Sequence, residues 1–201
     1  MFGMTNDTST NALELLRHDH QEVDGLFKQY EQMKESADDS EKEALVTRIC
    51  DALTVHAQIE ETIFYPAARR ALPQEPGQDL LNEAAVEHQT LKDIIGRLEA
   101  APTSDPLFDA GVKVLSEYTK HHVREEETEL FPKVKSSDMD LQAIGQQLAE
   151  RKQQLEGEMT KSSRNGSQGR KGSRSQQTAE GSQRWRDQGG SGNEQRSRNT
   201  H

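Results

Sequence analysis

One segment of this sequence occurs twice, 66 residues apart, and each copy carries a histidine followed four residues later by a glutamate. Residues 56–66 read HAQIEETIFYP, and residues 122–132 read HVREEETELFP. A shorter pair, DHQ at 19–21 and EHQ at 87–89, lies 68 residues apart. Internal repeats expose architecture, and these indicate two helical hairpins of the same design that face each other.

Apolar residues recur at alternating steps of three and four, the spacing that keeps one face of a helix turned inward. Four segments follow it: 13–30, 45–63, 81–98 and 108–130. Polar or proline-containing breaks separate them at 35–40, 72–77 and 101–106. Because such short connections make successive helices antiparallel neighbours, we predict an all-α, up-down-up-down four-helix bundle.

A weaker amphipathic stretch follows the repeats, with Leu141, Ile144, Leu148 and Leu155 on one face. It predicts a short fifth helix that packs across one end of the bundle or extends as a surface helix. The later residues are rich in Ser, Gly, Gln and Arg, and such a composition buries too little surface to offset chain entropy. We therefore expect a helical domain over 10–158 and a disordered basic tail over 159–201.

Charge and composition exclude several classes of protein. Residues 1–159 carry 16 Lys and Arg against 32 Asp and Glu, whereas residues 160–201 carry 9 against 3. An acidic head argues against nucleic-acid binding, which needs clustered basic residues. No apolar run is long enough to span a bilayer and no leader pattern opens the chain, so a cytoplasmic location is expected. The single cysteine, Cys50, excludes an intrachain disulfide and a thiolate-rich metal site.

Residues at i and i+4 lie one turn apart on a helix, so His56 with Glu60, and His122 with Glu126, each present a nitrogen and an oxygen to one point. His20 and His88 occupy inward positions on the other two helices. A lone histidine on an apolar face is more often a hydrogen-bonded core residue than a ligand. Four of them with two carboxylates, related by a pseudo-twofold, instead indicate two metal ions with each glutamate able to bridge them. The candidate ligands are His20, His56, Glu60, His88, His122 and Glu126.

Several neighbouring residues have weaker claims. Glu61 and Glu127 directly follow candidate ligands, and we expect them to support the site or line its rim. Tyr30, Tyr65 and Tyr118 could each donate a hydrogen bond to the site, although core packing is the simpler expectation. Pro66 and Pro132 are expected to mark a kink or a helix end, because proline lacks a backbone N–H.

These motifs resemble the hemerythrin-like HHE cation-binding family over about residues 10–158. The DHQ and EHQ segments and the paired HxxxEE segments, which end in Tyr-Pro and Phe-Pro, carry the resemblance. It implies an up-down four-helix bundle around a non-haem di-iron centre. By this resemblance the six candidate residues are the expected ligands of two iron ions joined by an oxo or hydroxo bridge, and manganese or zinc is less favoured.

The chain departs from the oxygen-carrying hemerythrins at two positions. Those proteins have a second histidine one turn after the third-helix histidine, where this chain has Lys92, and an aspartate where it has Glu126. A site richer in carboxylates argues against simple reversible oxygen carriage.

The leading functional hypothesis is a di-iron protein that binds O2, H2O2 or NO in oxidative or nitrosative stress response or redox sensing, with peroxide decomposition as a candidate activity. One alternative is an iron reservoir or iron sensor without turnover. Another is a metal-free helical interaction module. Small molecules are the expected partners, and the sequence identifies no protein partner.

Overall fold

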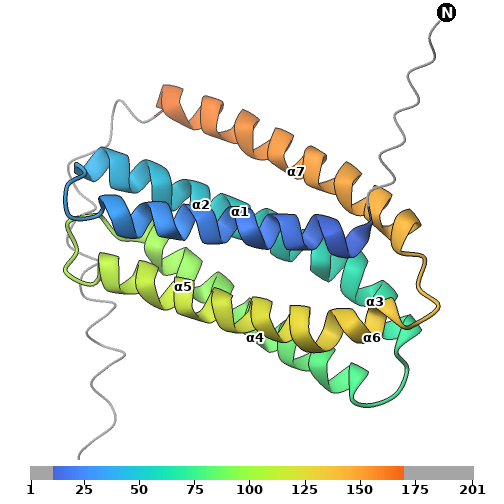
Figure 1. Ribbon diagram of the computed structural model, residues 1–201. Helices are drawn as coiled ribbons and strands as arrows, with labels where there is room; N and C mark the ends of the chain where they lie inside the picture. Colours follow the sequence, from blue (N-terminus) through green and yellow to red (C-terminus); the bar gives the residue numbers. More distant parts are fainter. Residues whose placement is uncertain (1–10, 170–201) are drawn as a thin grey trace, which may run out of the picture.

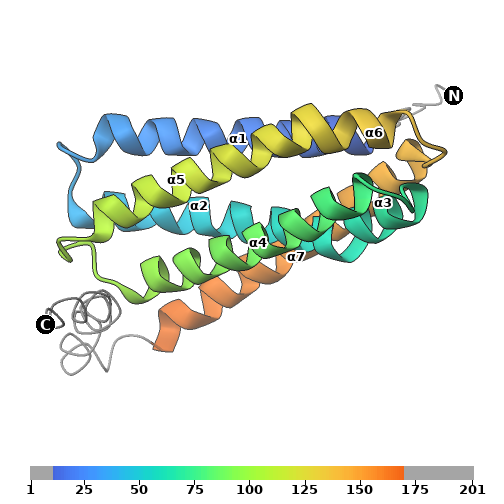
Figure 2. The same cartoon turned by 90° about the horizontal axis from the view of Figure 1, so that it is seen from below.

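The computed structural model describes residues 11–169, which form helices joined by short loops (Figure 1). Four long helices make up the bundle: α1 (Ala12–Met33), α2 (Asp39–Ile59), α4 (Gly77–Ala100) and α5 (Phe108–Glu125). α1 packs on α2 and α4 packs on α5, and contacts of α2 with α4 and of α1 with α5 close the ring (Figure 2). The predicted all-α, up-down-up-down bundle is confirmed.

Local signals in the sequence set where the first two helices begin. The side chain of Asn11 accepts a hydrogen bond from the backbone N–H of Leu13 at 2.9 Å, which satisfies one of the free donors at the start of α1. At the start of α2, Asp38 and Glu41 accept each other's backbone N–H at 2.9 and 3.1 Å, forming a capping box. Both interactions are encoded within three residues of sequence.

Each copy of the repeat contains a turn of π-helix that the sequence analysis did not predict. The π turns are Glu60–Phe64 and Glu126–Leu130, and they lead into α3 (Tyr65–Ala71) and α6 (Phe131–Lys135). In each turn the backbone N–H five residues after the first glutamate donates to the carbonyl of that glutamate. Pro66 and Pro132 were expected to mark a kink or a helix end; the helical backbone continues through both of them as α3 and α6. The wider turn ends two residues before Pro66 and Pro132, whose rings cannot continue an ordinary α-helical ladder.

The interior consists of two apolar clusters with the inward histidines between them. On α1, His20 lies between Leu16 of one cluster and Val23 of the other; on α4, His88 lies between Ala84 and Leu91 in the same way. The first cluster occupies the end of the bundle near α3 and α6, and the second occupies the end near the α1–α2 loop. The candidate site is therefore a polar layer that is closed on both sides by apolar packing.

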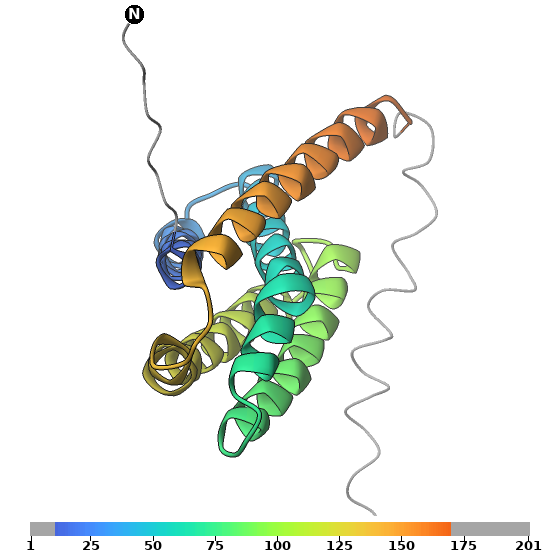
Figure 3. The ribbon, with the colours of Figure 1, turned by 90° about the vertical axis from the view of Figure 1, so that its right-hand side faces the viewer.

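The fifth helix, α7 (Leu141–Gly169), is longer than the short helix expected. It packs along α1 and α2 and crosses the bundle obliquely (Figure 3). Leu148 and Leu155 are buried against the first apolar cluster, as their spacing predicted. Residues 159–169, assigned to the tail on composition, continue this helix, and the rest of the predicted tail lies outside the described residues. Within residues 11–169, none of the helices combines the length and hydropathy that crossing a bilayer requires.

Candidate metal centre

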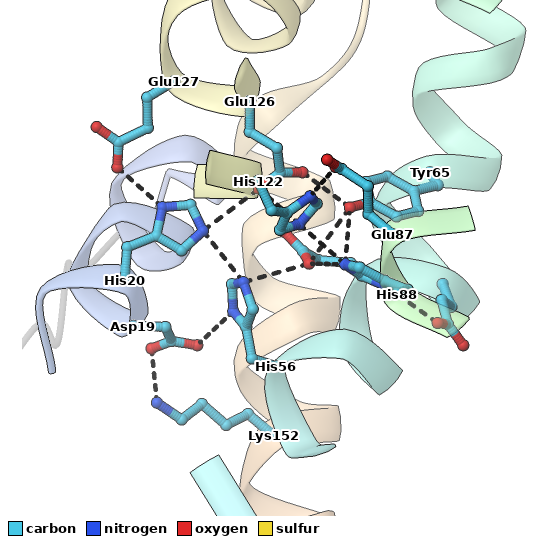
Figure 4. Close-up of polar contacts among 12 residues, drawn as sticks. Asp19, His20, His56, Tyr65, Glu87, His88, His122, Glu126, Glu127 and Lys152 are labelled. Carbon is cyan, nitrogen blue, oxygen red and sulfur yellow. Dashed lines mark hydrogen bonds and ion pairs between the residues drawn. The ribbon is translucent and has the colours of Figure 1, made fainter. Parts of the chain in front are cut away.

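The four inward histidines meet in two pairs at the centre of the bundle (Figure 4). The Nε2 atoms of His20 and His56 lie 3.1 Å apart, and those of His88 and His122 lie 3.0 Å apart. All four residues are buried, with at most 6% of their surface exposed. One pair joins α1 to α2 and the other joins α4 to α5, so the two hairpins contribute equivalent halves, as the repeat predicted.

Each candidate glutamate lies between a histidine of its own helix and one of the opposite hairpin. Glu60 Oε2 is 3.2 Å from His56 Nε2 and 3.4 Å from His88 Nε2. Glu126 Oε2 is 3.7 Å from His122 Nε2 and 3.3 Å from His20 Nε2. Each carboxylate therefore lies close to imidazoles of both hairpins.

The donor atoms form two overlapping groups, each compact enough to surround one cation. One group holds His20, His56, Glu60 and Glu126; the other holds Glu60, His88 and His122; within each, the atoms lie within 4.8 Å of one another. Among the described residues, Glu60 Oε1 and Glu126 Oε2 are buried atoms without a hydrogen-bond partner. A buried carboxylate oxygen without a donor is costly, and a cation removes that cost. The residues present therefore fit a pair of metal ions held by nitrogen and oxygen.

The glutamates that follow the candidate ligands hold the outer ring nitrogens of histidines on the opposite hairpin. Glu127 Oε1 accepts from His20 Nδ1 at 2.8 Å, and Glu61 Oε1 accepts from His88 Nδ1 at 3.0 Å. Such carboxylates fix the proton on Nδ1, which leaves the Nε2 lone pair directed at the centre. Glu61 and Glu127 thus take the supporting position that was expected of them.

The sequence analysis missed two further carboxylates, Asp19 and Glu87, which are almost fully buried. Glu87 Oε2 accepts from His122 Nδ1 at 2.8 Å, whereas Asp19 Oδ2 lies 3.6 Å from His56 Nδ1, too far for a hydrogen bond. Both residues precede the histidine of a DHQ or EHQ segment, so the repeat contained the signal: an acidic residue recurs beside each of these histidines.

Lys92, which stands where a carrier has its extra histidine, does not point into the centre. Its Nζ lies 2.6 Å from both carboxylate oxygens of Glu61. The hydroxyl of Tyr65 occupies the space beside His88 instead. It donates to Glu126 Oε1 at 2.9 Å and lies 3.2 Å from His88 Nε2. The hydroxyl oxygen of Tyr65 is therefore a further candidate metal ligand, on the side of the site that Lys92 leaves open.

The π turn explains why a residue expected to pack in the core reaches the site. The extra residue in the turn allows the consecutive side chains Phe64 and Tyr65 to be buried together. The matching residue of the second repeat is Phe131, which stacks on the ring of His20 with 5.9 Å between ring centroids. The phenol therefore breaks the pseudo-twofold, and this Tyr-to-Phe difference was visible in the repeat.

We expect the metal-free Tyr65→Phe variant to be less stable than the wild-type chain by about 1–2 kcal/mol, because it leaves a buried carboxylate oxygen without its donor. Chemical denaturation followed by circular dichroism measures this difference. Tyr118→Phe is the matched control, since Tyr118 is 42% exposed. Equal stabilities of the two variants would contradict a role for the Tyr65 hydroxyl in the site.

The two buried glutamates have opposite electrostatic environments in the metal-free chain. Burial, reinforced by the negative charge of Glu126, raises the pKa of Glu60 well above its usual range. Burial also opposes ionisation of Glu126, but the neighbouring His122 and His20 outweigh it and lower the pKa of that carboxyl. Burial lowers the pKa of His56 to about 4, which keeps this imidazole neutral and able to bind a metal at neutral pH. Without metal, Glu60 is thus the carboxyl whose charged form the site disfavours.

Two known proteins are similar to this chain in sequence. The chain is 29% identical over 127 residues to a DNA nickase of Nostoc sp., covering 63% of this chain but 34% of that protein, so it spans about a third of that relative's length. It is 25% identical over 150 residues to the uncharacterized protein Rv2633c of Mycobacterium tuberculosis, covering 73% of this chain and 88% of that protein.

A solved structure and a family model agree on the fold and the class of domain. The crystal structure of a hemerythrin HHE cation-binding domain-containing protein from Mycobacterium kansasii, a homologue of Rv2633c, superposes with a TM-score of 0.61 at 27% identity and covers 74% of this chain and 88% of that one. The model of the hemerythrin HHE cation-binding domain matches residues 11–134, more than half of the chain. The chain belongs to the hemerythrin HHE cation-binding domain family.

Proposed function

We propose that this protein binds two iron ions at the centre of its bundle and takes up a small ligand such as O2, H2O2 or NO there, in oxidative or nitrosative stress response or redox sensing. The proposed ligands are His20, His56, Glu60, His88, His122 and Glu126. The single observation that carries the proposal is the pair of overlapping donor groups that share the buried Glu60. Imidazole with carboxylate is a donor set that suits iron, and a bound iron pair supplies redox chemistry that side chains lack.

The space beside the histidines supports a ligand of very small size. A cavity of about 20 Å³ is lined by all four histidines and, among others, by Leu53, Leu91, Ile95 and Val123. Such a volume holds about one water-sized molecule, which excludes an organic substrate as its occupant in this conformation. Apolar walls keep bulk water from the site, and the neighbouring carboxylates hold the rings in place.

A second candidate function, an iron sensor or reservoir, is favoured by the position of Glu60 and Glu126. Two carboxyls that are at most 2% exposed and share one centre destabilise the metal-free bundle, so iron would add folding free energy. The two functions differ in what iron removal does. A sensor would lose protection from a protease when iron is removed, whereas an enzyme scaffold would keep it.

Metal content per chain tests the proposal. We expect elemental analysis to find about two iron ions per chain, with visible absorption bands that change when azide or peroxide is added under controlled oxygen. Bands that react with peroxide and then recover would favour peroxide decomposition over storage. Protein without stoichiometric metal after reconstitution with iron, manganese or zinc would overturn the proposal and favour a metal-free helical interaction domain.

A further inference from the structure

A groove of about 540 Å³ lies between α1, α2 and α7 and reaches Asp19, whose carboxylate lies 3.6 Å from His56 Nδ1. Asp19 lines it from α1, Asp51 from α2 and Lys152 from α7. The groove exists because α7 crosses the bundle obliquely and covers α1 and α2 only in part (Figure 3). The proposed function does not assign it a role.

The charges that line this groove favour a cation. Four carboxylates line it, against two basic side chains; in order they are Asp19, Glu22, Asp51 and Glu156, with Arg48 and Lys152. A second opening of about 260 Å³ reaches His20 on the other side of α1. It is lined by two carboxylates and two basic side chains: Asp24, Glu127, Lys120 and Arg124. Of these two openings, the groove under α7 is the one with an excess of negative charge, which would concentrate divalent cations.

One wall of the groove ends on a carboxylate that has one oxygen without a hydrogen-bond partner. Asp19 is 5% exposed, and its Oδ2 atom is without a hydrogen bond, as is His56 Nδ1 at 3.6 Å. A cation held by Asp19 would therefore lie one imidazole ring away from the candidate metal centre. The carboxylate connects the solvent-facing groove with a proposed ligand.

The ammonium group of Lys152 already marks a cation position in this groove. Its Nζ lies 2.6 Å from Asp19 Oδ1 and 3.8 Å from both Glu22 Oε2 and Glu156 Oε1 (Figure 4 shows the Asp19 contact). Asp19 and Glu22, together with His18, also offer ligand atoms within 4.8 Å of one another. Three carboxylates from two helices thus surround one positive charge, in an arrangement that a divalent cation could share.

We propose that the groove under α7 is the route by which divalent metal reaches the centre, and that Lys152 occupies its inner end as a resident cation that the incoming metal displaces. This inference rests on the proposed function, because it requires a metal centre to be filled. Displacement frees Asp19 to hold the incoming ion next to His56. α7, which the repeat does not contain, then serves to shape the route.

The rate of metal loading tests the route. Metal-free full-length chain is mixed with Co2+, and the visible bands of the bound ion are followed by stopped flow. We expect Glu22→Gln/Asp51→Asn/Glu156→Gln to load about tenfold more slowly at low ionic strength, with the difference shrinking as salt is added. The final metal content should equal that of the wild type. Glu43→Gln/Asp93→Asn/Glu117→Gln, which neutralises three exposed carboxylates outside the groove, is the matched control and should load at nearly the wild-type rate.

A second variant isolates the role of Lys152. Lys152→Met should load severalfold faster than wild type, while Lys28→Met, which removes a lysine that is 67% exposed on α1, should not. Equal rates for the groove variant and its control would overturn the route, and a Lys152→Met rate no higher than wild type would overturn the displacement step. Failure of the wild-type chain to bind any Co2+ or iron would instead overturn the proposed function itself. Far-ultraviolet circular dichroism confirms that each variant is folded.

Discussion

A chain with alanine at both His56 and His122 is expected to retain less than about a tenth of the wild-type iron. Loss of a carboxylate that merely orients a metal-bound histidine lowers metal affinity by about 10- to 100-fold, and this variant removes one proposed ligand from each half of the site. The Nε2 atoms of His56 and His122 lie 3.1 and 3.0 Å from those of His20 and His88, so each half of the site would keep a single imidazole. Elemental analysis after reconstitution and desalting measures the loss, and the iron absorption bands should disappear with it.

The chain offers a matched control for this experiment. His18 and His121 are 76% and 58% exposed, so the double change to alanine at these positions removes the same number of imidazoles but none of the proposed ligands. We expect this control to keep its iron. Retention of iron by the His56 and His122 double variant, or equal loss in the control, would contradict the assignment of the site. Comparing helix content of the two variants separates loss of ligands from loss of the fold.

Replacing Glu60 with glutamine should change stability in opposite directions with and without metal. In the loaded protein the amide is a weaker ligand than a bridging carboxylate, so the variant should lose the stabilisation that metal binding contributes. In the metal-free protein the amide removes an ionisable group that is 0% exposed and has an oxygen without a donor. We therefore expect the metal-free variant to be more stable than wild type by about 1–3 kcal/mol at alkaline pH.

The pH dependence of the metal-free chain gives this prediction a definite sign. Because burial and Glu126 raise the pKa of Glu60 above its ordinary value of 4.5, the folded chain binds more protons there than the unfolded chain. The contribution of Glu60 to the free energy of unfolding of the metal-free chain is fully present below pH 4.5. It is lost as pH rises toward the pKa of Glu60 in the folded chain, by at most about 1.4 kcal/mol per pH unit. Urea unfolding at pH 6, 7 and 8 should show the advantage of the variant growing with pH.

Stability measured with and without iron decides whether Glu60 is a metal ligand. Glu129→Gln replaces an exposed carboxylate on the π turn of the second repeat, and its effect on stability should be small and of the same sign with and without iron. If Glu60→Gln destabilised the metal-free chain at every pH, the buried carboxyl would be a structural group rather than a metal ligand. A reversal of sign on loading would favour both the proposed site and a contribution of iron to folding.

Much of the fold was predictable because it depends on short-range geometry. The steps of three and four residues determine which face of a helix is apolar, and the capping interactions of Asn11 and Asp38 lie within three residues of the helix start. The pairing of His56 with Glu60 follows from the helical pitch alone. The duplicated motif then indicated that two such pairs would face each other, and the structure brings all six candidate residues together.

Other features depend on contacts that spacing cannot specify. The π turns change the helical register after Glu60 and Glu126, and only this change brings the hydroxyl of Tyr65 to the centre. Which carboxylate reaches which ring is decided by how neighbouring helices cross, so Asp19 and Glu87 could not be assigned to His56 and His122 from the repeat alone.

The sequence by itself determined an all-helical bundle and six candidate metal ligands, because helical periodicity and a duplicated motif are local properties of the chain. Only the tertiary structure decided the position of α7 over α1 and α2, and with it the place of Lys152 beside Asp19, 133 residues away in sequence. The physical reason is that an amphipathic helix outside a repeat carries no information on its partner. Its docking site is chosen by the apolar and charged surface that the finished bundle leaves exposed.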